Sequence, residues 1–204
     1  MSTRRSNVER TQRTRAQLTR QARQLFSERG YSATTIAEIA RSSGVTTGAL
    51  YHHWAGKEAL LVDVVHDIHR ELALRIQALD VEDEPVARLL RSGQEFLALC
   101  ADPAVARLLL LDAPAVLGYE RWRRIDEQWW LSATIRLVER ARPTTGPGGN
   151  SGDPGLDGAE TSRQLALALL GALTYLGHEV AMKGVAAVTG TGRTYDVLLT
   201  SLLK

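Results

Sequence analysis

The spacing of apolar residues is the feature that most constrains the fold of this chain. Ala and Leu recur three or four residues apart, whereas Val, Ile and Thr form no run in which apolar and polar residues alternate. The first pattern is typical of amphipathic helices, and the missing second pattern is what a half-buried strand would need. With 44% hydrophobic residues in 204, the chain can form a proper core. The sequence therefore predicts an all-α globular protein.

Capping and turn residues predict where the helices begin and end. Gly30 ends a first helix over residues 8–29. Thr35 and Glu38 form a Ser/Thr-x-x-Glu capping box, which starts a short second helix. Gly44 can adopt the positive φ of the turn that follows. The further helices are expected at residues 46–53, 57–79, 85–101, 103–112, 118–142, 159–184 and 192–203.

Charge is distributed unevenly along the chain. Residues 1–60 hold ten Lys/Arg against four Asp/Glu, whereas residues 61–204 hold fifteen against nineteen. Such an asymmetry is expected when one end of a protein meets nucleic acid. We therefore expect one domain at 1–60 and a larger helical domain at 61–204. Residues 143–158 contain six Gly and three Pro and are expected to form a flexible loop.

The segment 36–50 carries the strongest local signal. Two short helices flank a glycine turn, the small Ala40 lets them approach closely, and Ile39, Val45 and Leu50 can fill the wedge between them. An ordinary helical hairpin would show the same pattern. The basic charge and the polar third helix favour a DNA-binding helix-turn-helix, because a recognition helix must present hydrogen-bonding side chains to base edges.

An ordered set of short motifs runs through this part of the chain. They are Thr34-Thr35-Ile36, Ile39-Ala40, Gly44-Val45, Gly48-Ala49-Leu50-Tyr51-His52-His53-Trp54 and Gly56-Lys57-Glu58-Ala59-Leu60-Leu61. Together they resemble the N-terminal domain of the TetR family of transcriptional regulators, over about residues 13–65. The remainder agrees with that family in length and helical layout. The resemblance implies an N-terminal three-helix helix-turn-helix head, joined to a larger helical ligand-binding and dimerisation domain.

The resemblance also implies which side chains meet DNA. Thr35 and Lys57 are expected at phosphates, since both stand at helix starts. The full set of expected DNA-binding residues is Thr35, Thr46, Thr47, Gly48, Tyr51, His52 and Lys57. Thr35 can equally be a simple cap, and Trp54 is expected in the core. Arg4, Arg5, Arg10 and Arg13 can form either a basic arm along DNA or a solvated tail.

Aromatic residues of the second domain are candidates for a small-molecule site. Ligand pockets combine aromatic walls with a few polar groups, and the residues expected to supply them are Trp122, Trp129, Tyr175 and His178. The same helical spacing also fits core packing. The last two helices are expected to form the dimer surface, through Leu165, Leu169, Ala172, Leu176, Leu198, Leu199 and Leu202, with Gly171 and Gly177 allowing close approach.

The implied function is that of a ligand-responsive repressor, which binds a palindromic operator in double-stranded DNA as a homodimer. We expect a cytoplasmic protein with no catalytic activity, cofactor, metal ion or membrane contact. The longest apolar stretch, 165–176, is too short to span a bilayer and reads as a buried helix. Cys100 is the single cysteine, which forbids an internal disulfide.

Two other functions remain open at this point. A sequence-independent architectural protein would bind all duplexes similarly. An enzyme with a helical head is the second alternative, but the chain contains no phosphate loop, paired-cysteine metal spacing or nucleophile elbow. The nearest approach to a metal cluster is His66 and His69 with Asp63 and Asp67, which we interpret as a solvated helix face.

Overall fold

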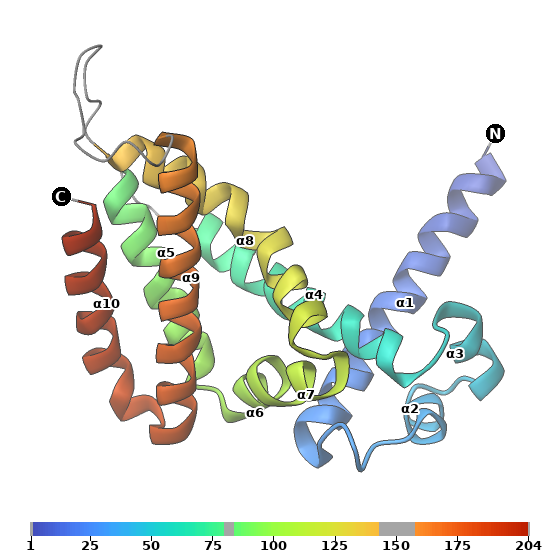
Figure 1. Ribbon diagram of the computed structural model, residues 1–204. Helices are drawn as coiled ribbons and strands as arrows, with labels where there is room; N and C mark the ends of the chain where they lie inside the picture. The colour runs from blue at the N-terminus through green and yellow to red at the C-terminus, as the bar shows by residue number, and fades with distance from the viewer. Residues whose placement is uncertain (1, 80–83, 143–157, 204) are drawn as a thin grey trace. The chain divides into compact units, whose positions relative to one another are not determined.

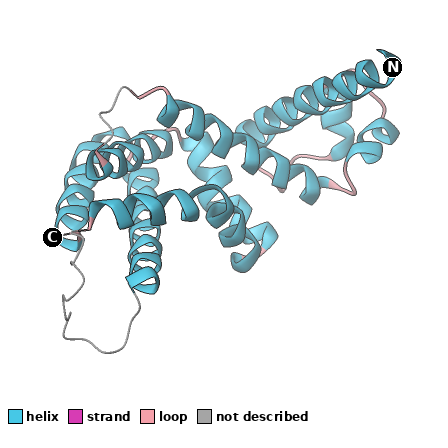
Figure 2. Cartoon of the chain, turned by 90° about the horizontal axis from the view of Figure 1, so that it is seen from above, coloured by secondary structure: helices cyan, strands magenta, loops and turns pink. Residues whose placement is uncertain are grey.

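Helices are the regular secondary structure of the described residues, with short turns and loops between them. The computed structural model describes residues 2–79, 84–142 and 158–203, and none of these residues lies in a strand (Figure 2). The predicted all-α fold is therefore confirmed. The loop expected at 143–158 lies, as far as residue 157, outside the described residues. The elements are α1 (Ser2–Arg29), α2 (Ile36–Ser42), α3 (Thr47–His53), α4 (Lys57–Gln77), α5 (Pro85–Cys100), α6 (Pro103–Ala106), η1 (Arg107–Asp112), α7 (Ala113–Leu117), α8 (Tyr119–Ala141), α9 (Gly158–Lys183), η2 (Val185–Ala187) and α10 (Val188–Leu202).

Local capping explains several of these boundaries. The Thr35 hydroxyl accepts a hydrogen bond from the Glu38 backbone N–H at 3.2 Å, and the Glu38 carboxylate accepts one from the Thr35 N–H at 2.8 Å. This is the predicted capping box. Glu84 caps α5 in the same manner, accepting from the Ala87 N–H at 2.6 Å, and Pro85 follows in the first turn.

The region 103–117 is less regular than the sequence predicts. Instead of one helix over 103–112, the four residues of α6 lead into the π-helical η1, and α7 follows. Leu108, Leu109 and Leu110 are all buried. Three successive buried leucines lack the spacing from which a helix register can be predicted.

The chain divides into two compact units. Unit 1 comprises Met1–Arg70 with Arg107–Trp122, and unit 2 comprises Glu71–Ala106 with Arg123–Lys204. This division differs from the predicted boundary at residue 60, because η1 and α7 pack with the N-terminal helices. The Tyr31 backbone N–H donates to the Asp112 carboxylate at 3.3 Å, which ties η1 to the turn after α1.

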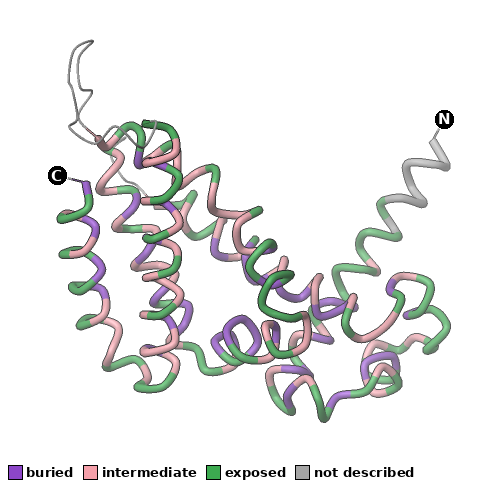
Figure 3. Tube along the Cα trace, in the orientation of Figure 1, coloured by how far each residue is buried: buried purple, intermediate pink, exposed green. Residues whose placement is uncertain are grey.

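In unit 1, the buried side chains come from every helix of the head. Leu18, Ala22 and Phe26 of α1 face inward, as the expected stripe requires, and Ile68 and Leu61 of α4 are completely buried. Figure 3 shows this alternation of buried and exposed residues along the helices.

In unit 2, α5, α9 and α10 lie side by side (Figure 1). A Cβ atom at position 93 would lie 2.3 Å from the Tyr195 ring, so the absence of a side chain on Gly93 leaves room for the buried tyrosine. Leu169 and Leu199 are fully buried in the same core. The Gly177 backbone approaches Phe96 of α5 in the same way. The expectation that Leu169, Leu199 and Gly177 lie on a dimer surface is therefore wrong.

Among the described residues, α9 alone has the length and apolar composition of a membrane-spanning helix. The core helices of globular proteins pass the same test.

Candidate nucleic-acid interface

The helices α2 and α3 form a helix-turn-helix with a buried apolar side. Ile39, Ala40 and Leu50 are each at most 2% exposed. Gly44 adopts a φ of 69° in the turn, and the Val45 N–H donates to the Ala40 carbonyl at 3.0 Å. The predicted glycine turn and wedge are confirmed, and they fix α3 against α2.

The other side of α3 is polar and exposed. Thr46 is its N-cap, and the Thr46 hydroxyl accepts from the Ala49 N–H at 3.1 Å. The Tyr51 side chain is 57% exposed, although tyrosine is a large hydrophobic residue. The exposed residues on this side, which we call the α3 face, are Thr46, Thr47, Gly48, Tyr51 and His52. Five of the seven predicted DNA-binding residues are thus brought together on one short helix.

The remaining two predicted residues have other partners in the structure. Thr35 is exposed, but its hydroxyl caps α2 and donates to the Glu38 carboxylate at 2.8 Å. The hydrogen bonds from Thr35 hold the pKa of Glu38 below its ordinary value. An anionic Glu38 beside Thr35 opposes a phosphate there, so the phosphate contact of Thr35 stays a prediction.

Lys57 is engaged inside the head. Its ammonium group donates to the carbonyls of Tyr31 at 2.9 Å and Thr34 at 2.8 Å, and it lies 4.2 Å from the centre of the Tyr31 ring. Two of its three N–H groups are therefore used to join α4 to the turn between α1 and α2. These partners occupy two of the three N–H groups, so the phosphate contact of Lys57 stays a prediction.

Asp63 joins α4 to α1 and to Trp54 through hydrogen bonds. Its carboxylate accepts two hydrogen bonds from Arg15 of α1, at 2.6 and 3.0 Å, and one from the Trp54 indole N–H at 3.0 Å. The Arg15 guanidinium also lies 5.3 Å from the Trp54 ring centre. Trp54 is 4% exposed, so its predicted core position is confirmed.

Asp63, His66, Asp67 and His69, the nearest approach to a metal cluster in the sequence, all lie on α4. Asp67 pairs with Arg70 at 2.9 Å, and His69 is 1% exposed. Burial lowers the pKa of His69 to about 3. The interpretation of this surface as a solvated face is therefore wrong for His69. No group of three or more His, Cys, Asp or Glu is placed to hold a metal ion in the described parts of the chain.

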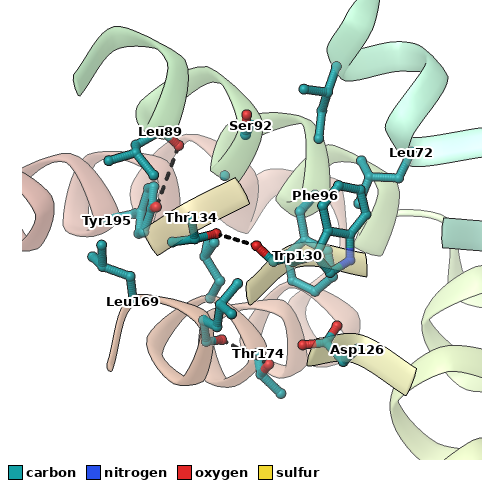
Figure 4. A pocket seen from close by; sticks show the side chains of 14 residues that line it. Leu72, Leu89, Ser92, Phe96, Asp126, Trp130, Thr134, Leu169, Thr174 and Tyr195 are labelled. Carbon is teal, nitrogen blue, oxygen red and sulfur yellow. Dashed lines mark hydrogen bonds between the residues drawn. The ribbon is translucent and has the colours of Figure 1, made fainter. Parts of the chain in front are cut away.

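Unit 2 contains a cavity between its helices (Figure 4). Its empty volume is about 530 Å³, which includes the open mouth. The lining residues are Leu72, Ile76, Leu89, Ser92, Gly93, Phe96, Asp126, Trp130, Thr134, Leu169, Leu170, Leu173, Thr174 and Tyr195.

None of the four aromatic residues predicted to bind a ligand lines this cavity, so their ligand contacts stay a prediction. Trp122 is a core residue of unit 1, and its indole N–H donates to the Leu109 carbonyl at 2.8 Å. Tyr175 is 71% exposed. Trp129 precedes the lining residue Trp130, and successive helical residues point about 100° apart. His178 contacts the Thr174 carbonyl through its Nδ1 atom, at 2.8 Å.

Comparison with known families assigns both parts of the chain. Residues 18–64, which contain the helix-turn-helix, match the family described as bacterial regulatory proteins, tetR family. Residues 86–144 match the tetracyclin repressor-like C-terminal domain. The chain belongs to the TetR family.

Solved TetR structures agree with the fold along nearly the whole chain. A TetR-family transcriptional regulator from Pectobacterium atrosepticum matches with a TM-score of 0.71 and 27% identity, over 96% of each chain. The fatty acid degradation regulator FadR from Bacillus halodurans matches with a TM-score of 0.66 over 91% of this chain and 93% of its own. Its identity is 19%, so it supports the fold alone.

Curated relatives match over only part of the chain. The transcriptional regulator TtgR from Pseudomonas putida is 42% identical over 83 residues, which are 39% of this chain and 38% of TtgR. The transcriptional repressor KstR2 from Mycolicibacterium smegmatis is 38% identical over 76 residues, which are 37% of each chain. The chain thus aligns with less than two fifths of the length of these relatives.

The TetR resemblance located the head but not the cavity. Asp126, Phe96 and Tyr195 line the cavity, and none of them was singled out from the sequence. A lone Asp on a helix reads as a solvent-exposed residue, and a Tyr near the end of the chain gives no sign of its neighbours. The missed signal was the spacing of Asp126, Trp130 and Thr134, which places all three on one face of α8.

Proposed function

We propose that this TetR-family chain is a sequence-specific DNA-binding repressor, which binds a palindromic operator as a homodimer and is released by a small molecule. The observation that carries the proposal is the α3 face. It is polar and exposed, while the other side of α3 is fixed by Leu50 in the helix-turn-helix core. A helix held in this manner can enter the major groove without losing its own packing.

The α3 face offers the chemistry that base reading requires. Thr46 and Thr47 supply hydroxyl groups, His52 an imidazole, and Tyr51 a phenol. These groups can exchange hydrogen bonds with base edges or phosphates. Gly48 has no side chain, and its Cβ position has only the Thr46 hydroxyl nearby, at 3.8 Å. The backbone of α3 can therefore approach DNA closely at this point.

The homodimer is supported by exposed, uncharged stripes on α9 and α10. On α9 the exposed positions include Gly171, Tyr175 and Met182, of which Tyr175 and Met182 are large side chains more than two thirds exposed. On α10, Val197 is 68% exposed. Pairing these stripes between two protomers would bury them and would present two α3 faces, one for each half of a palindrome.

The small-molecule response is assigned to the cavity of unit 2. A ligand that binds the DNA-free form more tightly shifts the equilibrium away from DNA by that difference in affinity, typically about 1–3 kcal/mol. As a DNA-binding regulator the protein would act in the cytoplasm, and no catalytic role is assigned to it.

The direct test is selection of random duplexes by the purified chain at near-physiological salt, followed by sequencing. The proposal predicts enrichment of one palindrome. The double variant Thr47→Glu, Tyr51→Ala changes the α3 face and should retain no enriched sequence, while Glu139→Gln on α8 serves as the control and should enrich the same palindrome. Retention of all duplexes without enrichment would instead support an architectural DNA-binding protein.

A further inference from the structure

The cavity of unit 2 carries a single formal charge in an otherwise uncharged lining. Of the fourteen lining residues, all within the described part of the chain, Asp126 alone is charged (Figure 4). The wall around it consists mainly of leucine, isoleucine and aromatic side chains. Because an ionised carboxylate is costly to keep in apolar surroundings, its presence there indicates what the cavity can bind.

Asp126 stands at one end of a row of side chains. Asp126, Trp130 and Thr134 follow each other at four-residue spacing along α8, so they share one helix face. In Figure 4 the carboxylate is drawn on the same side of the cavity as Phe96 and Trp130, and Tyr195 lies on the other side. The cavity therefore has an aromatic and anionic end and a second end closed by a buried tyrosine.

The polar groups of the lining do not neutralise Asp126. The hydroxyls of Thr134 and Thr174 each donate to the carbonyl four residues earlier, at 2.9 and 3.0 Å. The Tyr195 hydroxyl donates to the Leu89 carbonyl at 3.5 Å. Among the described residues, the Asp126 carboxylate forms no hydrogen bond or ion pair. Its acceptor capacity is thus available to a ligand.

The electrostatic environment of Asp126 determines which charge a bound ligand should carry. Burial raises the pKa of Asp126 to about 6, and the adjacent Glu127 carboxylate adds to this shift. At neutral pH the group is still mostly ionised, at a cost in free energy. A cation in the cavity would offset this cost, an anion would increase it, and a neutral molecule would leave it in place.

We propose that the cavity binds a slim apolar molecule with one ammonium group, whose charge pairs with the Asp126 carboxylate. The faces of Phe96 and Trp130 also attract ammonium groups, and the leucines hold the apolar part. A volume of about 530 Å³, part of it at the open mouth, is sufficient for a single alkyl chain or ring. We further propose that this amine is the effector of the repressor. The effector role rests on the proposed function, whereas the amine site itself does not.

The test is calorimetric titration of the full chain with three probes of equal length, octylamine, octan-1-ol and octanoate, at pH 7.5. Octylamine is protonated at this pH and should bind about tenfold more tightly than either other probe. Asp126→Asn keeps the shape of the side chain and should weaken octylamine binding about tenfold while leaving octan-1-ol unchanged. Glu139→Gln removes an exposed charge from the same helix and should change neither affinity.

Equal binding of the three probes, no binding of octylamine, or an unchanged octylamine affinity in Asp126→Asn would overturn the proposal. Thermal unfolding of each variant establishes that it is folded. DNA binding is measured separately, by anisotropy of a labelled selected duplex. Charge-selective octylamine binding without release of DNA would support the amine site and contradict its role as effector site. Calorimetry decides the amine site even if no duplex is bound.

Discussion

The ammonium group of Lys57 lies 4.2 Å from the centre of the Tyr31 ring, and it donates hydrogen bonds to the carbonyls of Tyr31 and Thr34. One side chain at the start of α4 thus fixes the turn between α1 and α2. We therefore expect the order of the helix-turn-helix to depend on this contact, and DNA affinity to depend on it indirectly.

Replacement of Lys57 tests this contact. Lys57→Met leaves two partly buried carbonyls without their donor, so we expect the free energy of unfolding to fall by about 1–3 kcal/mol, measured by urea denaturation. The matched control is Lys183→Met, which removes an exposed (i, i+4) partner of Glu179 and should change stability far less than Lys57→Met does. Equal losses in the two variants would show that the Lys57 contact does not stabilise the head.

Substitution of two glycines that have similar backbone conformations but different neighbours distinguishes the cost of backbone strain from the cost of packing. Gly30 and Gly44 have φ values of 86° and 69°. A Cβ on Gly30 would lie 1.9 Å from the Arg107 guanidinium, whereas a Cβ on Gly44 would meet nothing within 4 Å. We expect Gly44→Ala to cost about 1 kcal/mol from backbone strain alone. Gly30→Ala should cost only slightly more, because the flexible and partly exposed end of Arg107 must also move aside. Thermal unfolding that ranks Gly44→Ala as the less stable variant would contradict this packing.

The α3 face can be altered without changing stability. Thr47 is exposed, so Thr47→Glu should change the free energy of unfolding by less than about 0.5 kcal/mol. The new carboxylate would face phosphates and base edges, and we expect DNA affinity to fall by about two orders of magnitude in fluorescence anisotropy. Thr189→Glu, on α10, introduces the same charge away from α3 and should leave DNA affinity nearly unchanged. An equal effect of both variants would indicate that net charge, rather than the α3 face, controls binding.

The partly buried carboxylate of Asp126 gives stability a defined pH dependence. Its pKa of about 6 lies above the ordinary value of 3.8, so between these values the folded state binds more protons than the unfolded state. The contribution of Asp126 to the free energy of unfolding therefore decreases as pH rises from about 4 to 6, and the loss persists above pH 6. Asp126→Asn removes this cost. We expect the variant to be more stable than the wild type by about 1–3 kcal/mol at pH 7.5 and nearly equal to it at pH 4. A less stable variant at pH 7.5 would show that the carboxylate is not penalised by burial.

Local sequence signals predicted the head correctly because they act over a few residues. The capping box of Thr35 and Glu38 and the turn at Gly44 need only neighbouring backbone groups, and both are present. The wedge residues Ile39 and Leu50 follow from helical spacing in the same way. These are interactions whose partners are near in sequence.

Interactions between distant residues were not predictable from such signals. Lys57 reaches carbonyls 23 and 26 residues earlier, and nothing in its own segment indicates that partner. Trp122 and Trp130 both lie on α8, but the first packs in unit 1 and the second lines the cavity of unit 2. Helical spacing showed that aromatic residues share a helix. It could not show which neighbours each of them meets.

The central claim, that α3 reads sequence, is tested most directly by a ratio of two affinities. The duplex enriched by selection and a shuffled duplex of the same composition are titrated with the full chain at about 150 mM salt. We predict that the selected palindrome binds about 10³-fold or more tightly than the shuffled duplex. In Thr47→Glu this ratio of affinities should fall to near one. A wild-type ratio below about tenfold would contradict sequence-specific recognition, since phosphate contacts alone account for binding that ignores sequence.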